Sequence, residues 1–171
     1  LDLRNLMYTG YAAFNGPFVI RYPRGKGEMK DWRNEMQVLP IGKGKKLRDG
    51  DDIAVLSIGP IGNEVIKAIE MVKEEGVSIA HYDMIYLKPL DEELLHEIGR
   101  KYNRIITVEN GVIKGGFGSA VLEFMADNGY TPHVKRIGVP DAFIEHGSIP
   151  ELYQLCGMDA ESIAKQLKKE N

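Results

Sequence analysis

Two arginines stand close together near the start of the chain, in the segment Arg21-Tyr22-Pro23-Arg24-Gly25. Proline restricts the backbone between them, and glycine frees it directly afterwards. A stiffly held pair of guanidinium groups suits bidentate hydrogen bonding to a carboxylate or a phosphate. The residues alone leave a second interpretation open, in which both arginines form structural ion pairs across a domain boundary.

A glycine-rich turn, Gly115-Gly116-Phe117-Gly118-Ser119, follows an apolar strand pattern and leads into a helix pattern. Backbone N–H groups at such a helix start can bind a phosphate. The spacing, however, matches neither the dinucleotide-binding motif nor the P-loop motif. We therefore interpret this segment as a tight turn that lets a helix approach another backbone closely.

Several acidic residues stand at the carboxyl ends of predicted parallel strands. Open α/β sheets bind ligands at this edge. Asp83 and Glu109, the latter followed by Asn110, could form an acid–base pair, and Asp141 with His146 could form a catalytic dyad. Carboxylates at strand ends also cap loops and helices, and no serine or cysteine nucleophile has a supporting sequence context. A structural role is the better interpretation of all these groups.

Metal and thiol chemistry have little support in the sequence. The single cysteine, Cys156, excludes an intrachain disulfide and favours a reducing compartment. No cationic group that would stabilise a thiolate stands beside it, so a small buried side chain is expected. The histidines lie too far apart for metal-ligand spacing: His81, His96, His133 and His146. We predict no metal site within the chain.

The elements that must position these residues alternate along the second part of the chain. Apolar runs predict strands at 38–41, 53–58, 78–82, 104–108 and 134–139. Helical patterns stand between the later strands and after the last one, with Asp91 and Asp159 as helix caps. This predicts a three-layer α/β/α domain with a mostly parallel five-stranded sheet. Only a short turn joins the first two strands, so the first is expected to run antiparallel.

Residues 1–25 do not fit this alternation. They predict a helix over 1–15 and a short strand over 18–20, as in the end of a preceding α/β domain. The polar stretch 26–35 is interpreted as a linker, which leaves 36–171 as the second domain. Because the chain starts at Leu1 inside structured-looking sequence, we expect it to be a piece of a longer protein.

Composition is that of a globular chain. The 171 residues are 43% hydrophobic and 27% charged, with a mean hydropathy of -0.25, which excludes a disordered tail, a collagen-like repeat and a coiled coil. No apolar run approaches the roughly 18 residues of a membrane span, and neither a signal peptide nor a transit peptide pattern is present. The net charge of -3 argues against a dedicated nucleic-acid binder.

Charge is distributed unevenly along the chain. Residues 1–48 hold ten Lys or Arg against four Asp or Glu, and residues 49–171 hold twelve against twenty-one. The basic first segment suits an anionic ligand or an acidic partner. A solvated surface without a partner is the alternative explanation.

Several stretches, in one order across nearly the whole chain, resemble the C-terminal end of 1-deoxy-D-xylulose-5-phosphate synthases, thiamine-diphosphate enzymes of the transketolase superfamily. They are Gly16-Pro17 with Arg21–Gly25, Leu39–Gly44, Lys88–Asp91, Thr107–Glu109, Gly115–Val121, and Pro140–Phe143 with His146-Gly147. Each motif alone is modest, and the ordered series is specific. The resemblance implies a transketolase C-terminal-like fold for residues 36–171, and the end of a pyrimidine-binding domain for residues 1–25.

The resemblance also implies an activity, expected of the longer protein. Such an enzyme is a cytoplasmic homodimer that condenses pyruvate with glyceraldehyde 3-phosphate and releases carbon dioxide. Thiamine diphosphate and Mg²⁺ carry the carbanion chemistry, and the product feeds isoprenoid, thiamine and pyridoxal phosphate synthesis. The family's metal and diphosphate motif and its cofactor-activating glutamate have no counterpart here. We therefore expect no catalytic, cofactor-binding or metal-binding residue in this chain, and no activity from it alone.

One substrate contact is implied within the chain. Arg24 matches the family arginine that contacts the phosphate of the aldehyde substrate, and Arg21 is a weaker neighbour with a structural role. The family often has Glu-Glu-Asn where this chain has Glu109-Asn110-Gly111, which leaves any role of that turn open. Alternatives are the C-terminal part of another thiamine-diphosphate enzyme, of transketolase or pyruvate dehydrogenase beta type, and a free-standing α/β module for dimerisation or ligand binding.

Overall fold

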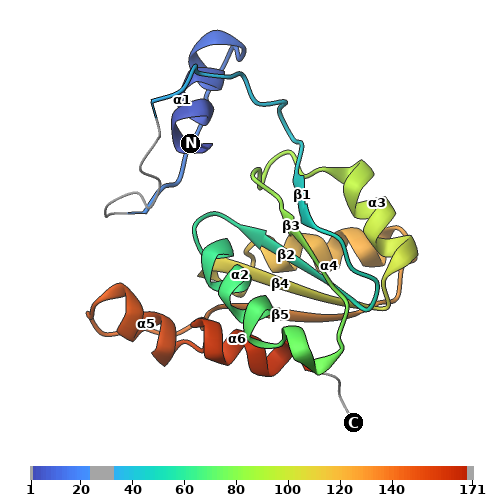
Figure 1. Ribbon diagram of the computed structural model, residues 1–171. Coiled ribbons are helices and arrows are strands. Elements are labelled where there is room, and N and C mark those ends of the chain that lie inside the picture. The colour runs from blue at the N-terminus through green and yellow to red at the C-terminus, as the bar shows by residue number, and fades with distance from the viewer. Residues whose placement is uncertain (1, 24–32, 169–171) are drawn as a thin grey trace. The chain divides into compact units, whose positions relative to one another are not determined.

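The computed structural model describes residues 2–23 and 33–168 (Figure 1). Contacts within the chain divide it into two compact units, Leu1–Ile41 and Gly42–Asn171. Most of the predicted linker at 26–35 falls outside the described residues, so the boundaries expected at residues 25 and 36 stay predictions.

The first unit is built on helix α1 (Asp2–Ala12), whose polar side chains hold an extended segment of backbone. Thr9 Oγ1 accepts a hydrogen bond from the Leu39 N–H at 2.8 Å, and Asn5 Oδ1 accepts one from the Gln37 N–H at 3.2 Å. Arg4 adds hydrogen bonds to the carbonyls of Asn34 and Glu35. The segment is therefore fixed by side chains of a helix and not by strand pairing.

Two short strands expected from apolar runs are absent from the described residues. Residues 18–20 form neither helix nor strand, and residues 38–41 form no strand either. The reason at 38–41 is that the Leu39 N–H already bonds to Thr9, and Pro40 has no N–H to give. The prediction of an edge strand there was wrong, since the edge strand begins four residues later, at Lys45.

The second unit contains a five-stranded mixed sheet. Its strands are β1 (Lys45–Arg48), β2 (Ile53–Ile58), β3 (Ile79–Asp83), β4 (Arg104–Val112) and β5 (His133–Val139), in the spatial order β1-β3-β2-β4-β5. Strand β1 runs antiparallel to β3, and every other pair is parallel. The predicted sheet, with five strands and an antiparallel first strand, is confirmed.

Helices cover both faces of this sheet and produce the three layers expected (Figure 1). One face packs against α2 (Gly62–Met71) and α6 (Ala160–Leu167), and the other against α3 (Glu92–Lys101) and α4 (Phe117–Asp127). Along β2, Ile53 and Val55 join the first core cluster, whereas Ala54 and Leu56 join the second. Both faces of the central strand are thus buried, which explains its unbroken apolar run.

The helix ends carry the capping residues that the sequence predicts. The Asp91 carboxylate accepts a hydrogen bond from the Leu94 N–H at the start of α3, and Asp159 does the same with Ser162 at the start of α6. A 3₁₀ helix, Lys73–Glu75, follows α2 and ends at Gly76, whose φ is 71°. The short helix α5 (Ile149–Leu155) completes the unit. Within the described ranges, no helix is long and apolar enough to span a bilayer.

Candidate functional site

The predicted site residues of the second unit gather at the carboxyl ends of the parallel strands. Asp83 closes β3, Glu109 lies near the end of β4, and Asp141 follows β5. In an open α/β sheet this edge is the usual place for a ligand site. What these groups contact decides whether they are available for chemistry.

Glu109 is buried, with 5% of its surface exposed, and both of its carboxylate oxygens bind the start of α4. Oε2 accepts a hydrogen bond from the Phe117 N–H at 2.9 Å, and Oε1 accepts one from the Gly118 N–H at 2.8 Å. The carboxylate therefore occupies the helix N-terminal N–H groups that a bound phosphate would need. A Cβ at Gly116 would lie only 2.2 Å from Glu109 Oε2, so glycine is required there. The interpretation as a tight structural turn is confirmed.

The other polar groups of the glycine turn also form hydrogen bonds within the second unit. Ser119 Oγ accepts hydrogen bonds from the Gly115 N–H at 3.0 Å and from Arg136 Nη1 at 2.8 Å. Arg136 Nη1 also donates to the Ile113 carbonyl at 2.9 Å. A Cβ at Gly118 would lie 2.4 Å from Thr107 Oγ1, because α4 packs tightly on the sheet.

The other strand-end acids do not form the pairs that catalysis would need. Asp83 Oδ1 accepts a hydrogen bond from the Ile85 N–H at 3.2 Å, where the chain turns and Ile85 has a φ of 54°. Asp141 forms an ion pair with Lys114 at 3.1 Å. His146 is exposed and makes no hydrogen bond to Asp141. Neither the acid–base pair nor the catalytic dyad is formed, and the structural interpretation is the better one for these groups.

The arginine cluster belongs to the first unit. Arg21 is exposed and lies outside any helix or strand. Arg24 lies outside the described residues. The predicted phosphate contact of Arg24 therefore stays a prediction.

A buried polar pair, which the sequence analysis missed, lies in the middle of the sheet. Ser57 Oγ and His81 Nε2 are 2.9 Å apart, and each residue is 1% exposed. Burial lowers the pKa of His81 to about 4, so its ring is neutral at pH 7. Both residues sit in apolar strand patterns, and only the parallel register of β2 with β3 reveals that they meet. His81 borders a cavity of about 230 Å³ that residues of β1 and α2 also line, among them Arg48 and Glu70, which form an ion pair.

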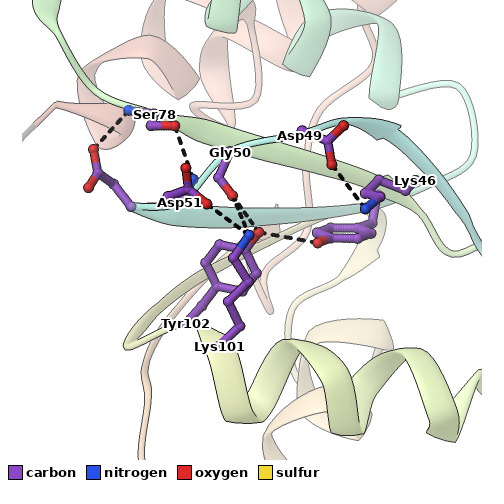
Figure 2. A network of polar contacts seen from close by, with 9 residues as sticks. Lys46, Asp49, Gly50, Asp51, Ser78, Lys101 and Tyr102 are labelled. Atoms are coloured by element: carbon purple, nitrogen blue, oxygen red, sulfur yellow. Dashed lines mark hydrogen bonds and ion pairs between the residues drawn. The ribbon is translucent and has the colours of Figure 1, made fainter.

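The amino ends of the strands carry a second polar cluster, which we call the amino-end network (Figure 2). The Gly50 carbonyl accepts hydrogen bonds from Tyr102 Oη at 2.7 Å and from Lys101 Nζ at 3.0 Å. Asp51 forms an ion pair with Lys101 at 2.9 Å, and its N–H donates to Ser78 Oγ. The hydrogen bond to Asp51 raises the pKa of Lys101. These contacts fix the turn between β1 and β2.

The described residues do not fit a thiamine-diphosphate or Mg²⁺ site. In the ranges 2–23 and 33–168, no three His, Cys, Asp or Glu side chains stand together as metal ligands. The one glycine turn that resembles a diphosphate cradle binds Glu109 instead. No catalytic step through such a cofactor is derived from these residues.

Comparison with known proteins gives consistent results. The family "Transketolase, C-terminal domain" matches residues 42–163, nearly the whole second unit. The 1-deoxy-D-xylulose-5-phosphate synthase of Parabacteroides distasonis is 98% identical over all 171 residues, which make up 27% of that protein. The enzyme of the same name from Bacteroides thetaiotaomicron is 61% identical over 99% of this chain and 26% of its own length.

Solved structures share the fold. A structure described as a split gene transketolase, inactive beta4 tetramer, superposes with a TM-score of 0.68 at 32% identity, over 77% of this chain and 45% of the other. Transketolase from Campylobacter jejuni, at 13% identity and a TM-score of 0.55, covers 73% of this chain and 18% of its own and shows the fold alone. The chain spans about a quarter of the length of the curated relatives that it matches. With its second unit matched almost from end to end, the chain belongs to the transketolase C-terminal domain family.

Proposed function

We propose that this chain is the C-terminal part of a 1-deoxy-D-xylulose-5-phosphate synthase. The observation that carries the proposal is the 98% identity, over every residue of the chain, to an enzyme of that name. The longer protein would be a cytoplasmic homodimer that joins pyruvate to glyceraldehyde 3-phosphate with loss of carbon dioxide. Thiamine diphosphate and Mg²⁺, held by residues outside this chain, would supply the carbanion chemistry. Its product would serve isoprenoid, thiamine and pyridoxal phosphate synthesis.

Within that enzyme, the second unit would support assembly and not chemistry. The support for this is that its candidate acids are already used: Glu109 caps α4, and Asp141 pairs with Lys114. The first unit would contribute Arg24 to the phosphate of the aldehyde substrate, with Arg21 in a structural role. The chain would be inactive by itself.

A free-standing assembly module is the second candidate, and one comparison favours it. The split gene transketolase structure is described as an inactive beta4 tetramer, and its chain is 32% identical to this one over the matched part. The words "split gene" and "inactive" in that description support a separately encoded chain of this type that lacks activity. A protein of this kind would need a second chain to supply the cofactor site.

Two activity measurements test the first candidate. Carbon dioxide release from pyruvate is measured in the presence of glyceraldehyde 3-phosphate, first with the longer polypeptide that ends in these residues and then with residues 1–171 alone. We expect turnover from the first and none from the second, and no binding of thiamine diphosphate to the second in calorimetry. Turnover or micromolar cofactor binding by residues 1–171 would overturn the assignment of the cofactor site to other residues.

The role of Arg24 is tested in the longer enzyme by Arg24→Ala, with Arg21→Ala as the matched control. Loss of a charged hydrogen bond to phosphate, worth about 1.5–3 kcal/mol, should raise the KM for glyceraldehyde 3-phosphate by roughly tenfold or more, since about 1.4 kcal/mol is tenfold. The KM for pyruvate should hardly change. Equal effects on both substrates, or a larger effect from Arg21→Ala, would rule out the phosphate contact.

A further inference from the structure

A cavity of about 230 Å³, which we call the β1–α2 cavity, is lined by Leu47, Arg48, Ile66, Ile69, Glu70 and His81. The register of β1 against β3 shifts between Lys46 and Arg48, which makes Leu47 the extra residue of a β-bulge. Successive side chains of a regular strand point to opposite faces of a sheet, but here Leu47 and Arg48 line the same cavity. The bulge therefore lets one strand contribute both an apolar and a cationic side chain to the cavity.

The cavity is bordered by a buried histidine with one unused ring nitrogen. His81 is 1% exposed, and its Nε2 lies 2.9 Å from Ser57 Oγ. The start of α2 closes the Ser57 side, where a Cβ at Gly62 would lie 2.9 Å from Ser57 Oγ. Among residues 2–23 and 33–168, no group forms a hydrogen bond with His81 Nδ1. Because the ring is neutral at pH 7, Nδ1 can donate or accept one hydrogen bond, according to the tautomer, with a molecule in the cavity.

The other walls of the cavity are apolar. Leu47, Ile66 and Ile69 line it, and Ile69 is buried in the core cluster that lies under α2. An apolar cavity of about 150 Å³ is large enough to hold benzene. The β1–α2 cavity therefore has room for a small ring or a branched chain together with a polar group.

The charged residues that line the cavity favour an anion. Arg48 Nη1 donates to Glu70 Oε1 at 3.0 Å, and Lys73 Nζ donates to Glu70 Oε2 at 3.2 Å. One carboxylate is thus shared by two cations, and the three groups together carry one positive charge. Within the described part of the chain, only Nη1 of Arg48 is bonded. The remaining guanidinium donors can therefore bind a carboxylate while the pair with Glu70 stays intact.

We propose that the β1–α2 cavity binds a small organic anion, namely an aromatic or branched carboxylate that also carries one hydrogen-bonding group. Arg48 binds the carboxylate, the apolar body lies against Leu47 and Ile66, and His81 Nδ1 takes the remaining hydrogen bond. The unused nitrogen of a buried ring is costly without a partner, and such a ligand supplies one. None of these contacts involves the strand-end acids or Arg24, so the inference does not rest on the proposed function.

The first test measures binding of 4-hydroxybenzoate to the longer polypeptide by ligand-observed NMR. We expect saturable binding with a Kd on the order of 1 mM, as suits a ligand of this size. Benzoate lacks the hydroxyl and should bind roughly threefold more weakly, and 4-hydroxybenzyl alcohol lacks the anion and should bind about tenfold more weakly. Equal affinities of the three compounds, or no saturable binding up to about 20 mM, would overturn the proposal and leave a cavity that holds water alone.

Two pairs of variants assign the binding to the cavity. Ile66→Trp fills the cavity from an exposed position of α2, and Met71→Trp, at another exposed position of that helix, is its control. Arg48→Met removes the cation, and Lys46→Met removes a neighbouring exposed cation of β1 that pairs with Asp49. We expect the two cavity variants to weaken binding about tenfold or more, and the controls to change it less than about twofold. Unchanged binding in Ile66→Trp, or equal losses in a variant and its control, would overturn the proposal.

Photolabelling with 4-azidobenzoate locates the bound anion independently of any substitution. After illumination of the longer polypeptide, labelled peptides are identified by mass spectrometry. We expect labelling of peptides that contain Leu47 or Ile66, and its suppression by excess 4-hydroxybenzoate. Labelling confined to other peptides would contradict the assignment. None of these readouts uses turnover, so their failure leaves the proposed function untouched, and the activity measurements test that function separately.

Discussion

The two ends of the β-sheet are built in opposite ways. At the amino end, the turn between β1 and β2 is fixed by Tyr102, Lys101 and Ser78, each bonded to a group of that turn. At the carboxyl end, the loop after β5 and helix α5 leave Phe143 and Leu155 in solvent. The polar groups of the amino-end turn thus find partners within the unit. At the carboxyl end the helix cap is formed within the unit, but large apolar side chains stay exposed.

Because of this difference, the two ends of the sheet should contribute differently to the free energy of unfolding. Polar groups that are matched inside the unit contribute to its free energy of unfolding, since a buried partner left alone is costly. Apolar side chains left in water contribute little to that free energy and become favourable only when a partner buries them. Substitutions at the two ends should therefore differ in size when residues 1–171 are unfolded alone.

The largest effect is expected at Gly50, in the amino-end turn. A Cβ at Gly50 would lie 2.2 Å from the backbone N of Ala80, and neighbouring backbone cannot move aside cheaply. Gly50→Ala should lower the free energy of unfolding by about 3 kcal/mol or more, measured by urea denaturation followed by circular dichroism. At the carboxyl end, a Cβ at Gly147 would meet only side-chain atoms among its three nearest neighbours, Leu152 at 3.3 Å and Glu151 Oε2 at 3.6 Å. Gly147→Ala should cost less than about 1 kcal/mol, and equal losses would contradict the comparison.

The second effect compares a buried histidine with an exposed one. The pKa of His81 is about 4 in the folded chain and 6.5 ordinarily, so between these values the unfolded chain binds more protons. Stability from the neutral ring is complete above pH 6.5 and is lost as the pH falls toward 4, by about 2 kcal/mol between pH 7 and pH 5.

Urea denaturation at several pH values measures this dependence. His81→Gln should remove that part of the slope. His146→Gln, at an exposed position, is the matched control. A slope that is unchanged in His81→Gln would show that other groups cause the acid sensitivity.

A smaller difference is expected between two tyrosine hydroxyls. Tyr102→Phe removes a buried donor to the Gly50 carbonyl and should cost about 1 to 1.5 kcal/mol. Tyr153→Phe removes a partly buried acceptor for the Asn110 amide and should cost about 0.5 kcal/mol. Thermal or urea unfolding of the two matched variants gives the order directly. If Tyr153→Phe cost more, α5 would be an important source of stability.

Much of the fold follows from the sequence because its strands are buried on both faces. The run at 53–58 is apolar throughout and predicts β2, whose residues join both core clusters. Strand β1 escaped prediction because Lys45–Arg48 is exposed at all four positions and contains only one apolar residue, Leu47. Its place at the edge of the sheet depends on pairing with β3, which is distant in sequence.

The candidate site was predicted only in part, because contacts between residues distant in sequence decide what its groups bind. The glycine turn indicates close packing by composition alone, but that Glu109 fills it depends on the length and direction of β4. Ser57 and His81 meet only through strand register. Phe143 is exposed although it is a large apolar residue, and its local sequence does not indicate that exposure.

The smallest effect is therefore predicted where a large aromatic residue is removed. Phe143 is fully exposed in this unit, so Phe143→Ser should change the free energy of unfolding of residues 1–171 by less than about 0.5 kcal/mol. The buried aromatic Phe117 in α4 is the matched control, and Phe117→Ala should cost roughly 3 kcal/mol or more. Urea unfolding of both variants measures the contrast. A loss above about 1 kcal/mol at Phe143 would mean that the side chain packs within its own unit, and the carboxyl end would then be closed like the amino end.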